Sequence, residues 1–543
     1  MSRNESSDTY GAPSWGGTDK ATTPGRRWNM KLFEEYLLSV RCSAKALRFG
    51  RRSAGSALID AMQGEIFHLH GILKVGIGVS ALQGLNPVGY PSIRQNRPHA
   101  LITRAFCGRA VPVKTLFAAV ALLRLPQILF RISRLRDKRG VEAIAVGRAR
   151  VGSYIYDACY LPRIKGVPIR QRLKIGYLLF CHYVDRLVIR LYHVELVVIG
   201  DPAYRSGMLF ELCRALGVKC INAVSVDSFQ MHKYFSASEF GRHYRDIPAS
   251  LLDAMGESPA VAVRLENYLN RRFSGKLEQH DAMRAFAEGK SRLSRKGFDA
   301  RYGLRNGAPL VFVMAHVLSD APHAYAPTLY VDYEEWVVAT VRALARNSRV
   351  NFLVKEHPSV ELYGEVGVLR ALLEAEGLGD RLLDSNVNTT SVIDSADAVI
   401  TCGGTIGIEA AAMGIPAVLA GRPPYAGKGF THEPESIADY EGLLSAGIES
   451  LPRLSPDRVA KARKVAYAMF ELFDNDAMSL ELGGVPYLRG RQFDESAFFR
   501  NVIEENRTPL RSQRIFGLLE EFDSSRDCSI INRAKLRSLQ EGG

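Results

Sequence analysis

The stretch that most constrains the fold runs from residue 396 to residue 429 and reads ADAVITCGGTIGIEAAAMGIPAVLAGRPPYAGKG. We expect an apolar strand at Ala398–Thr401, a glycine-rich turn at Cys402–Thr405, a helix at Ile406–Met413 and a second strand at Pro416–Ala420. Two strands joined through a helix run parallel in one sheet. The glycine pair then lies at the carboxyl end of a strand, where open α/β sheets bind their ligands.

Short apolar strands alternate with helical spacing through the whole C-terminal half. Further strands are expected at Pro309–Ala315, Val350–Val354 and Arg381–Asp384, and helices at Tyr333–Asn347, Leu362–Glu376 and Thr390–Ser395. This alternation predicts an α/β domain with a parallel, doubly wound sheet. We assign it to residues 293–455.

The glycine-rich turn is a candidate phosphate site. Gly403 and Gly404 allow close approach of the backbone, and Thr405 adds a hydroxyl at the helix start. Free N–H groups and the positive end of the helix attract an anion there. Glu409 lies about one helical turn further on, where a carboxylate suits ribose hydroxyls better than phosphate. An ordinary β–α turn without a ligand is the alternative.

A second candidate element follows the strand at Val350–Val354. Lys355, His357 and Pro358 stand where that strand ends. The proline stops the chain from continuing as strand or helix, and the lysine and histidine suit a diphosphate or a departing phosphate. A solvated edge lysine and a loop histidine are the alternative.

Other strand ends carry further polar groups. His316 follows the strand at Pro309–Ala315, with Asp320 in the loop behind it. Tyr425, in the Gly/Pro-rich loop Gly421–Thr431, is a candidate contact for a sugar or base. Carboxyl ends of parallel strands meet at one edge, so we expect these groups to converge there. Each of them is also compatible with a plain surface loop.

The N-terminal half contains one clear unit of the same kind. A strand at Leu196–Gly200 is followed by a polar loop, a helix at Met208–Leu216 and a strand at Val218–Ile221. Asp201, in that loop, is a candidate general base for an acceptor hydroxyl. An Asp–Pro turn that begins a helix is the alternative.

A chain of 543 residues is long for one hydrophobic core. We expect a disordered polar arm at 1–30 and a basic α/β domain at 31–292 that faces acceptor and membrane. The second α/β domain at 293–455 is then followed by a helical extension at 456–543.

The net charge of +14 is concentrated in one segment. Between His99 and Arg190 there are 18 Lys/Arg against 4 Asp/Glu. The apolar runs Thr115–Phe130 and Ile175–Ile199 lie in this segment, but charged residues interrupt both. A basic, apolar-rich surface predicts peripheral docking on an anionic membrane, with a solvated basic face as the alternative. No nucleic-acid recognition motif is present, so nucleic acid is not expected as a partner.

The cysteine spacing and the absence of several known motifs exclude some functions. The eight cysteines form no CxxC pair, and no secretory signal is seen, which predicts a reducing cytoplasm. No GxxxxGK[ST] loop and no HExxH or Cys/His cluster occurs. We therefore expect neither a P-loop kinase, nor a metal site, nor a resident cofactor.

Three segments resemble a known family of bacterial enzymes. Val354–Pro358 (VKEHP), Cys402–Ala412 (CGGTIGIEAAA) and Gly421–Thr431 resemble glycosyltransferases of capsule and surface polysaccharide biosynthesis, with Kdo-transferase-like and sialyltransferase-like relatives. The resemblance implies a GT-B fold, in which two Rossmann-like domains face a cleft and the C-terminal one binds a nucleotide sugar. It also implies that His357 and Thr405 hold the donor phosphates and that Glu409 holds the ribose.

The turn departs from the family pattern, because Cys402-Gly403-Gly404 stands where many relatives have a Ser/Thr-rich turn. That departure leaves the donor nucleotide open.

The resemblance implies sugar transfer without a metal. The partners would be a nucleotide sugar, a lipid-linked or polysaccharide acceptor, an anionic membrane surface and other polysaccharide assembly proteins. Asp201, His316 and His357 are then the candidate catalytic residues, and the expected location is the cytoplasmic face of the inner membrane.

Three other functions fit the same residues. A nonhydrolysing UDP-N-acetylglucosamine 2-epimerase also has a glycine pair before a helix with glutamate, but the segment after the last strand, Arg422-Pro-Pro-Tyr, differs from the usual pattern. A transferase of glycerol phosphate from a CDP-activated donor is the second. The third is an inactive GT-B scaffold in an assembly complex.

Overall fold

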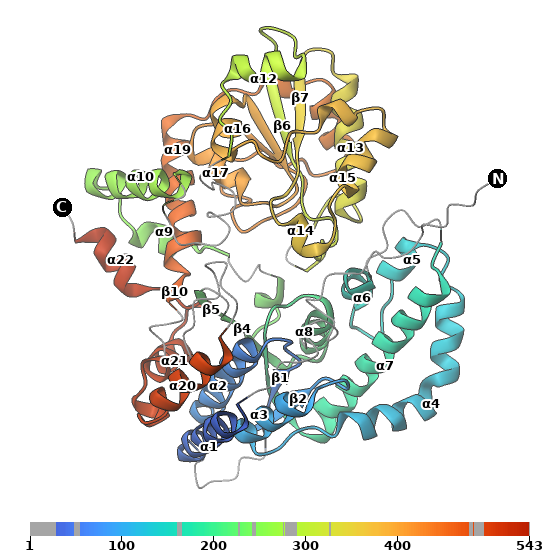
Figure 1. Cartoon of the computed structure of the whole chain (residues 1–543), viewed down its shortest axis with the longest axis vertical. Coiled ribbons are helices and arrows are strands. Elements are labelled where there is room, and N and C mark those ends of the chain that lie inside the picture. The colour runs from blue at the N-terminus through green and yellow to red at the C-terminus, as the bar shows by residue number, and fades with distance from the viewer. Residues whose placement is uncertain are drawn as a thin grey trace. The chain divides into compact units, whose positions relative to one another are not determined.

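The computed structural model describes residues 29–47, 55–159, 166–225, 228–241, 246–274, 290–324, 327–476 and 494–541, together with Lys276 and Leu482. Most of the arm expected at 1–30 lies outside these residues. Within them the chain divides into two compact units, which are described separately (Figure 1). Unit 1 comprises Ile247–Ala468 and the residues from Leu539, and unit 2 comprises the described residues up to Asp246 and Met469–Ser538.

Unit 1 is built on a four-stranded parallel sheet with the order β7-β6-β8-β9. The strands are β6 (Leu310–Met314), β7 (Asn351–Lys355), β8 (Ala398–Thr401) and β9 (Ala417–Leu419). All residues of β7, β8 and β9 are buried. A strand buried on both faces has helices on both sides, so the predicted doubly wound sheet is confirmed.

The helices of unit 1 alternate with these strands or pack beside them. They are α9 (Ala249–Ala254), α10 (Pro259–Phe273), α12 (Arg295–Tyr302), α13 (Tyr333–Arg346), α14 (Val360–Tyr363), α15 (Val368–Ala375), α16 (Thr389–Ser395), α17 (Ile406–Ala412), α18 (Ile437–Ser445) and α19 (Pro456–Tyr467).

Two local predictions for unit 1 were wrong. The single helix expected at Leu362–Glu376 is split into α14 and α15, because Gly364 and Gly367 adopt φ angles of 70° and 80° between them. The strand expected at Arg381–Asp384 is absent. A 3₁₀ helix ends at Arg381, and Leu382 forms only an isolated bridge with Val354.

Unit 2 is built on a six-stranded sheet with the order β10-β5-β4-β3-β1-β2. The strands are β1 (Ser56–Ala61), β2 (Asn86–Pro91), β3 (Val194–Ile199), β4 (Lys219–Ser225), β5 (Ser228–Tyr234) and β10 (Asn475–Asp476). Strands β4, β3, β1 and β2 run parallel, and β5 and β10 add antiparallel pairs. The predicted α/β class of the N-terminal half is thus confirmed, and the chain has the two Rossmann-like units of a GT-B protein.

The helices of unit 2 come from both ends of the chain. They are α1 (Met30–Ala46), α2 (Ile66–Leu82), α3 (Arg97–Cys107), α4 (Val113–Ser133), α5 (Lys138–Glu142), α6 (Gly152–Cys159), α7 (Ile169–Leu191), α8 (Tyr204–Leu216), α20 (Glu495–Glu505), α21 (Arg514–Ser524) and α22 (Arg533–Gln540), whose last residues belong to unit 1.

An aromatic cluster joins the two ends of the chain inside unit 2. The ring of Phe499 on α20 lies 5.5 Å from that of Phe33 and 4.8 Å from that of Tyr36, both on α1. The Tyr36 hydroxyl is 3.0 Å from Nδ1 of His70 on α2. Residues 494–538, which lie within the helical extension expected at 456–543, therefore contribute to the core of unit 2. The observed division also begins unit 1 at Ile247 instead of residue 293.

We predict that Phe499→Ala lowers the free energy of unfolding of unit 2 by about 3–5 kcal/mol, because it leaves a cavity between α1 and α20. Hydrogen exchange of α1 peptides should become markedly faster. Phe130→Ala is the matched control, because this phenylalanine is 59% exposed and should change stability by less than about 0.5 kcal/mol. Equal effects of the two substitutions would show that α20 is not part of this core.

Candidate functional site

The carboxyl edge of the unit 1 sheet brings together most of the predicted site residues. His316 follows β6, Lys355 ends β7 with His357 behind it, and the Gly403–Gly404 turn follows β8. Their order along the edge is set by the strand order β7-β6-β8. The expected convergence in unit 1 is thus present, whereas Asp201 belongs to unit 2.

His316 holds the glycine turn in place. Its Nε2 accepts a hydrogen bond of 3.1 Å from the Gly403 N–H and lies 3.3 Å from the Thr401 hydroxyl. Its ring stacks on Tyr333, with centroids 4.3 Å apart and planes 10° apart, and meets Trp336 edge-on. Burial, and secondarily nearby His357, lower the pKa of His316 from 6.5 to about 3. The imidazole is therefore neutral, with Nε2 as an acceptor.

The glycine turn is fixed from two further directions. The Gly404 N–H donates to the Thr401 hydroxyl at 3.1 Å, and the Gly404 carbonyl accepts from the hydroxyl of Tyr425. A Cβ at Gly404 would lie 2.9 Å from that threonine oxygen, so the turn requires glycine there. Tyr425 is fully buried. Its observed role is structural, and the predicted contact with a sugar or base gains no support.

The part of the turn open to a ligand lies one residue further on than expected. The N–H groups of Gly403 and Gly404 are both engaged, whereas those of Thr405 and Ile406 have no acceptor among the described residues. The Thr405 side chain is partly exposed and caps no backbone group in α17. Thr405 is the partly exposed residue of this pair and carries a hydroxyl as well as such an N–H, whereas Ile406 is buried.

Lys355 is buried at the end of β7 instead of projecting from its edge. Its Nζ donates to the carbonyl of Val387 at 2.8 Å, and the side chain is 5% exposed. Burial, and then the nearby charge of Lys290, lower its pKa from 10.5 to about 8. The charge of Asp384 opposes this shift in part, and the ammonium form of Lys355 still predominates at neutral pH.

His357 and Pro358 lie at the surface side of the same edge. Nδ1 of His357 accepts a 3.2 Å hydrogen bond from the Ser359 N–H, and the ring is partly exposed. Pro358 is exposed and follows the end of β7, where a proline was expected to stop the strand from continuing. Asp320 is partly exposed in the loop after β6, where the carboxylate of Glu365 accepts from the N–H groups of Leu318 and Ser319 at 2.8 Å each.

Glu409 has a partner that sequence reasoning missed. Its Oε1 accepts from Nε and Nη2 of Arg272 on α10, at 3.0 and 2.8 Å, and both side chains are almost completely buried. Burial of a lone carboxylate is expensive, so the guanidinium is what keeps Glu409 charged inside the unit. In this structure the Glu409 carboxylate forms a buried ion pair, and the expected ribose contact stays a prediction.

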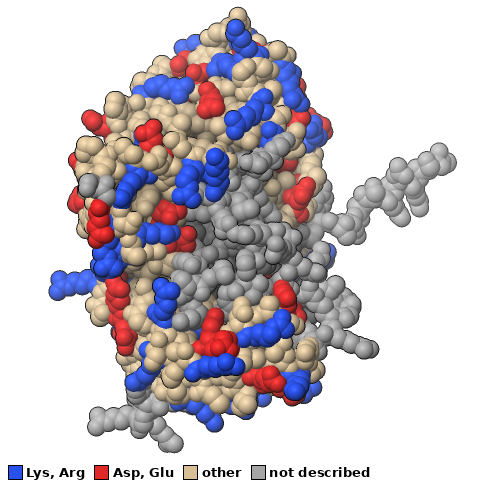
Figure 2. All heavy atoms as spheres, turned by 60° about the vertical axis from the view of Figure 1, so that its left-hand side comes forward, with Lys and Arg blue, Asp and Glu red and all other residues tan. Residues whose placement is uncertain are grey.

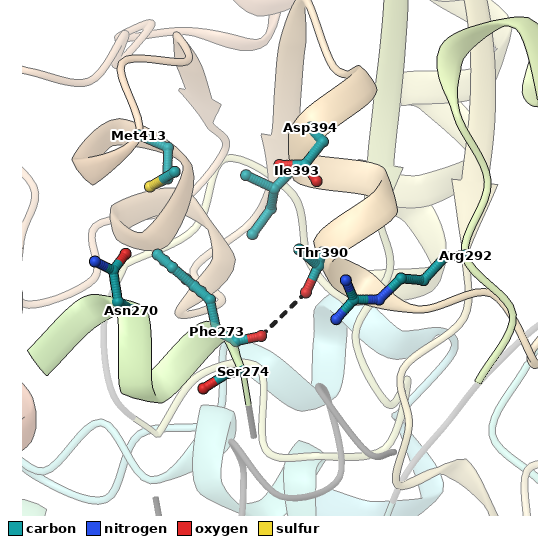
Figure 3. A pocket seen from close by; sticks show the side chains of 8 residues that line it. All are labelled: Asn270, Phe273, Ser274, Arg292, Thr390, Ile393, Asp394 and Met413. Carbon is teal, nitrogen blue, oxygen red and sulfur yellow. Dashed lines mark hydrogen bonds between the residues drawn. The ribbon is translucent and has the colours of Figure 1, made fainter. Parts of the chain in front are cut away.

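A small cavity of about 240 Å³ lies near this ion pair, between α10, α16 and α17 (Figure 3). It is lined by Asn270, Phe273, Ser274, Arg292, Thr390, Ile393, Asp394 and Met413. The Thr390 hydroxyl donates to the Phe273 carbonyl at 3.1 Å. None of the predicted site residues lines this cavity, so it does not coincide with the candidate site.

In unit 2, two aspartates follow neighbouring strands. Asp201, after β3, is exposed. Asp60, near the end of β1, is fully buried and accepts from the Ser206 hydroxyl at 2.6 Å and the Met62 N–H at 2.9 Å. Burial raises the pKa of Asp60. The strand-end rule that selected Asp201 would also have found Asp60, at the end of the apolar stretch from residue 56.

Within the described residues, no group of three or more His, Cys, Asp and Glu is placed to hold a metal ion. The same residues contain one helix, α4, that is long and apolar enough to cross a membrane. Only 11% of its most apolar 18-residue stretch is buried.

We predict that His316→Gln removes a pH dependence from unit 1. The folded-state pKa of about 3 lies below the unfolded value of 6.5, so only the unfolded state binds the proton between these values. Wild type thus loses stability as pH falls below about 6.5, while the variant is spared. The stability gap that favours wild type at pH 7 should narrow by about 1–2 kcal/mol at pH 5.

The measurement is urea unfolding followed by Trp336 fluorescence, with the other two tryptophans, Trp15 and Trp28, replaced by Phe. Because Trp336 packs against His316, its signal reports on this site. A gap that stays constant with pH would contradict the prediction, because it would show that folding does not change the pKa of His316.

We further predict that Glu409→Gln destabilises unit 1 by about 3–5 kcal/mol, because it leaves a buried guanidinium uncompensated. The double variant Arg272→Met/Glu409→Leu should recover most of this loss, as measured by the same unfolding experiment. If the double variant is no more stable than Glu409→Gln, the loss of stability does not come from an unpaired Arg272.

Much of this sheet edge lies in a segment that is similar to known proteins. A family model described as "Capsule polysaccharide biosynthesis protein" matches residues 335–441, which include β7, β8, β9 and the turn. No curated protein matches the chain in sequence.

Several solved structures are similar over larger parts of the chain. KpsC of Thermosulfurimonas dismutans, a beta Kdo 2,4 transferase, is 15% identical over 50% of this chain and 79% of its own, with a TM-score of 0.30. HepE of Anabaena, in complex with UDP-glucose, is 12% identical over 76% of this chain and 94% of its own, with a TM-score of 0.25. A UDP-N-acetylglucosamine 2-epimerase is 9% identical over 82% of this chain and 99% of its own, with a TM-score of 0.21.

Scores this low do not discriminate between a transferase and an epimerase. The family model is more specific, and it covers all three segments that suggested the resemblance. The resemblance is thus confirmed, and residues 335–441 match the family described as capsule polysaccharide biosynthesis protein.

Proposed function

We propose that this protein is a glycosyltransferase of surface polysaccharide synthesis. It moves a sugar from a nucleotide-activated donor to a growing polysaccharide or a lipid-linked acceptor. The observation that carries the proposal is the convergence of polar groups at the carboxyl edge of the unit 1 sheet, within a segment that matches the capsule polysaccharide family. In parallel α/β sheets this edge is where nucleotides bind.

The donor phosphates would lie against the turn after β8. Sugar transfer leaves negative charge on the nucleotide, and fixed donors stabilise that charge most effectively because they need no reorganisation. The Thr405 hydroxyl and the N–H groups of Thr405 and Ile406 would be such donors, because His316 fixes Gly403 and Thr401 fixes Gly404 just before them. His357 is partly exposed after β7, which β6 separates from β8, and it would add a further donor at the same edge.

Lys355 would act from a greater depth. Its ammonium is held on the Val387 carbonyl and has a pKa of about 8. A phosphate at the edge would stabilise the charged form of this lysine, so electrostatic support for the leaving group does not require a metal ion. Metal independence is accordingly part of the proposal.

Activation of the acceptor is assigned to Asp201. A general base must reach the hydroxyl that it deprotonates, and Asp201 is exposed, whereas Asp60 is buried and already bonded to Ser206. We therefore retain Asp201 as the candidate base and give Asp60 the role of fixing the start of α8.

We predict that one nucleotide among CMP, CDP, UMP, UDP and GDP stabilises unit 1 in a thermal-shift assay without divalent metal. A ligand at about 100 times its Kd adds roughly 2.7 kcal/mol. Thr405→Val and His357→Ala should each weaken binding about tenfold. Ser450→Ala, which removes an exposed hydroxyl elsewhere in unit 1, is the matched control.

Activity assays, together with this binding measurement, separate the other functions. Conversion of UDP-N-acetylglucosamine without any acceptor would identify an epimerase. Transfer from CDP-glycerol would identify a glycerophosphotransferase. No stabilisation by any nucleotide, with or without EDTA, would contradict the proposal and favour an inactive scaffold.

A further inference from the structure

Helix α4 exposes its apolar side chains to an unusual degree. Leu122 and Leu123 are 84% and 77% exposed, and Leu125, Leu129 and Phe130 are also exposed. Over its most apolar 18 residues only 11% of the helix is buried. Single exposed leucines are common on protein surfaces, but a helix with this many indicates contact with another phase or molecule.

The opposite side of α4, a helix that contains Pro126, packs on α7, which lies beside it in Figure 1. Ile128 and Ile132 are buried there, next to Gly176 of α7, where a Cβ would lie 3.4 Å from Ile132. Nearer the start of α4, the ring of Phe117 lies 5.5 Å from that of Phe180. The exposed side of α4 is therefore a defined face of a fixed helix.

The start of α7 extends this face. Ile169 and Leu173 are 71% and 58% exposed. The Arg172 guanidinium donates to the carbonyls of Ile132 and Ser133, at 2.8 and 2.6 Å, which attaches the start of α7 to the end of α4. We call the combined surface the α4–α7 face, and it consists of Leu122, Leu123, Leu125, Leu129, Phe130, Ile169 and Leu173.

Cations surround the α4–α7 face almost without acids. They are Lys114, Arg124, Arg131, Arg134, Arg136, Lys138, Arg139, Arg170, Arg172 and Lys174, and Asp137 is the one acidic residue in the segments 113–139 and 166–174. Asp137 is itself used as the cap of α5, where it accepts from Gly140 at 2.7 Å. Elsewhere, as on the face in Figure 2, cations and acids are interspersed.

The charge pattern selects the occupant of this face. A second copy of the chain would bring like charges together, which costs free energy. A membrane leaflet with anionic headgroups instead offers both phosphate for the cations and acyl chains for the leucines. Apolar side chains flanked by Lys and Arg are the composition of helices that lie in a membrane interface.

The same residues argue against a transmembrane orientation. Arg124 stands near the middle of α4, where a bilayer-spanning helix would place it in hydrocarbon at considerable cost. Its guanidinium instead lies 5.2 Å from the ring of Tyr183 on α7. Spanning would also require α4 to leave α7 and expose the buried side of both helices to lipid.

We propose that the α4–α7 face docks the protein on an anionic membrane, with α4 lying in the plane of the leaflet. The seven apolar side chains enter the interface and the surrounding cations contact lipid phosphates. The proposal assigns the membrane association that the composition predicts to one defined surface. It does not depend on the proposed enzymatic activity.

The test is flotation of the full chain with vesicles of phosphatidylcholine alone or with 30–40% phosphatidylglycerol, which is on the order of the anionic content that gives a strong surface potential. Binding should be strong only to the anionic vesicles at low salt and should weaken at about 0.5 M NaCl. Leu122→Ser/Leu123→Ser and Arg134→Gln/Arg136→Gln should each lower the partition coefficient at least about tenfold.

The matched control is Leu362→Ser/Val366→Ser, which removes two exposed apolar side chains from unit 1 and should leave vesicle binding unchanged. Thermal unfolding confirms that each variant is folded. The proposal is overturned if the α4 variants bind as wild type does. It is also overturned if bound protein resists extraction at alkaline pH as a spanning protein would, or if these variants abolish self-association while no vesicle is bound.

Discussion

The candidate site depends on a hydrogen bond to a neutral imidazole. His316 can accept from the Gly403 N–H only while Nε2 carries no proton, and its burial beside Tyr333 and Trp336 keeps it in that state. The bond fixes the chain at the carboxyl end of β8. It also occupies one of the donors that an anion would otherwise use, and Thr401 occupies the next. The open donors are thus displaced to Thr405 and Ile406.

The strands and the turn could be predicted from local sequence because parallel buried strands need continuous apolar runs. Strand β8 was predicted with the observed bounds, and β6 and β9 within one residue at each end. The convergence of strand ends followed from topology alone. Errors arose where a backbone conformation overrode apolar spacing, as at Gly364 and Gly367.

The roles of the side chains were less predictable because they depend on distant partners. Glu409 pairs with Arg272, which is 137 residues away in the chain, and no periodicity points to that contact. Lys355 has the expected position at a strand end, but its orientation is set by the Val387 carbonyl in another segment. The incorporation of α20 into unit 2 likewise depends on aromatic contacts with α1, at the other end of the sequence.

Both units bury charged groups whose partners offset their desolvation. In unit 1 these groups include Glu409 and Lys355, and in unit 2 Asp185 pairs with Arg205. Unit 2 also leaves apolar groups of α4 in water, and nothing within the described part of the chain covers them. Leu122 and Leu123 do not contribute to the side of α4 that packs on α7. Polar residues at these two positions would therefore stabilise that packing equally well. The presence of these leucines beside many arginines is explained by an environment that accepts both apolar chains and cations. An anionic leaflet is such an environment.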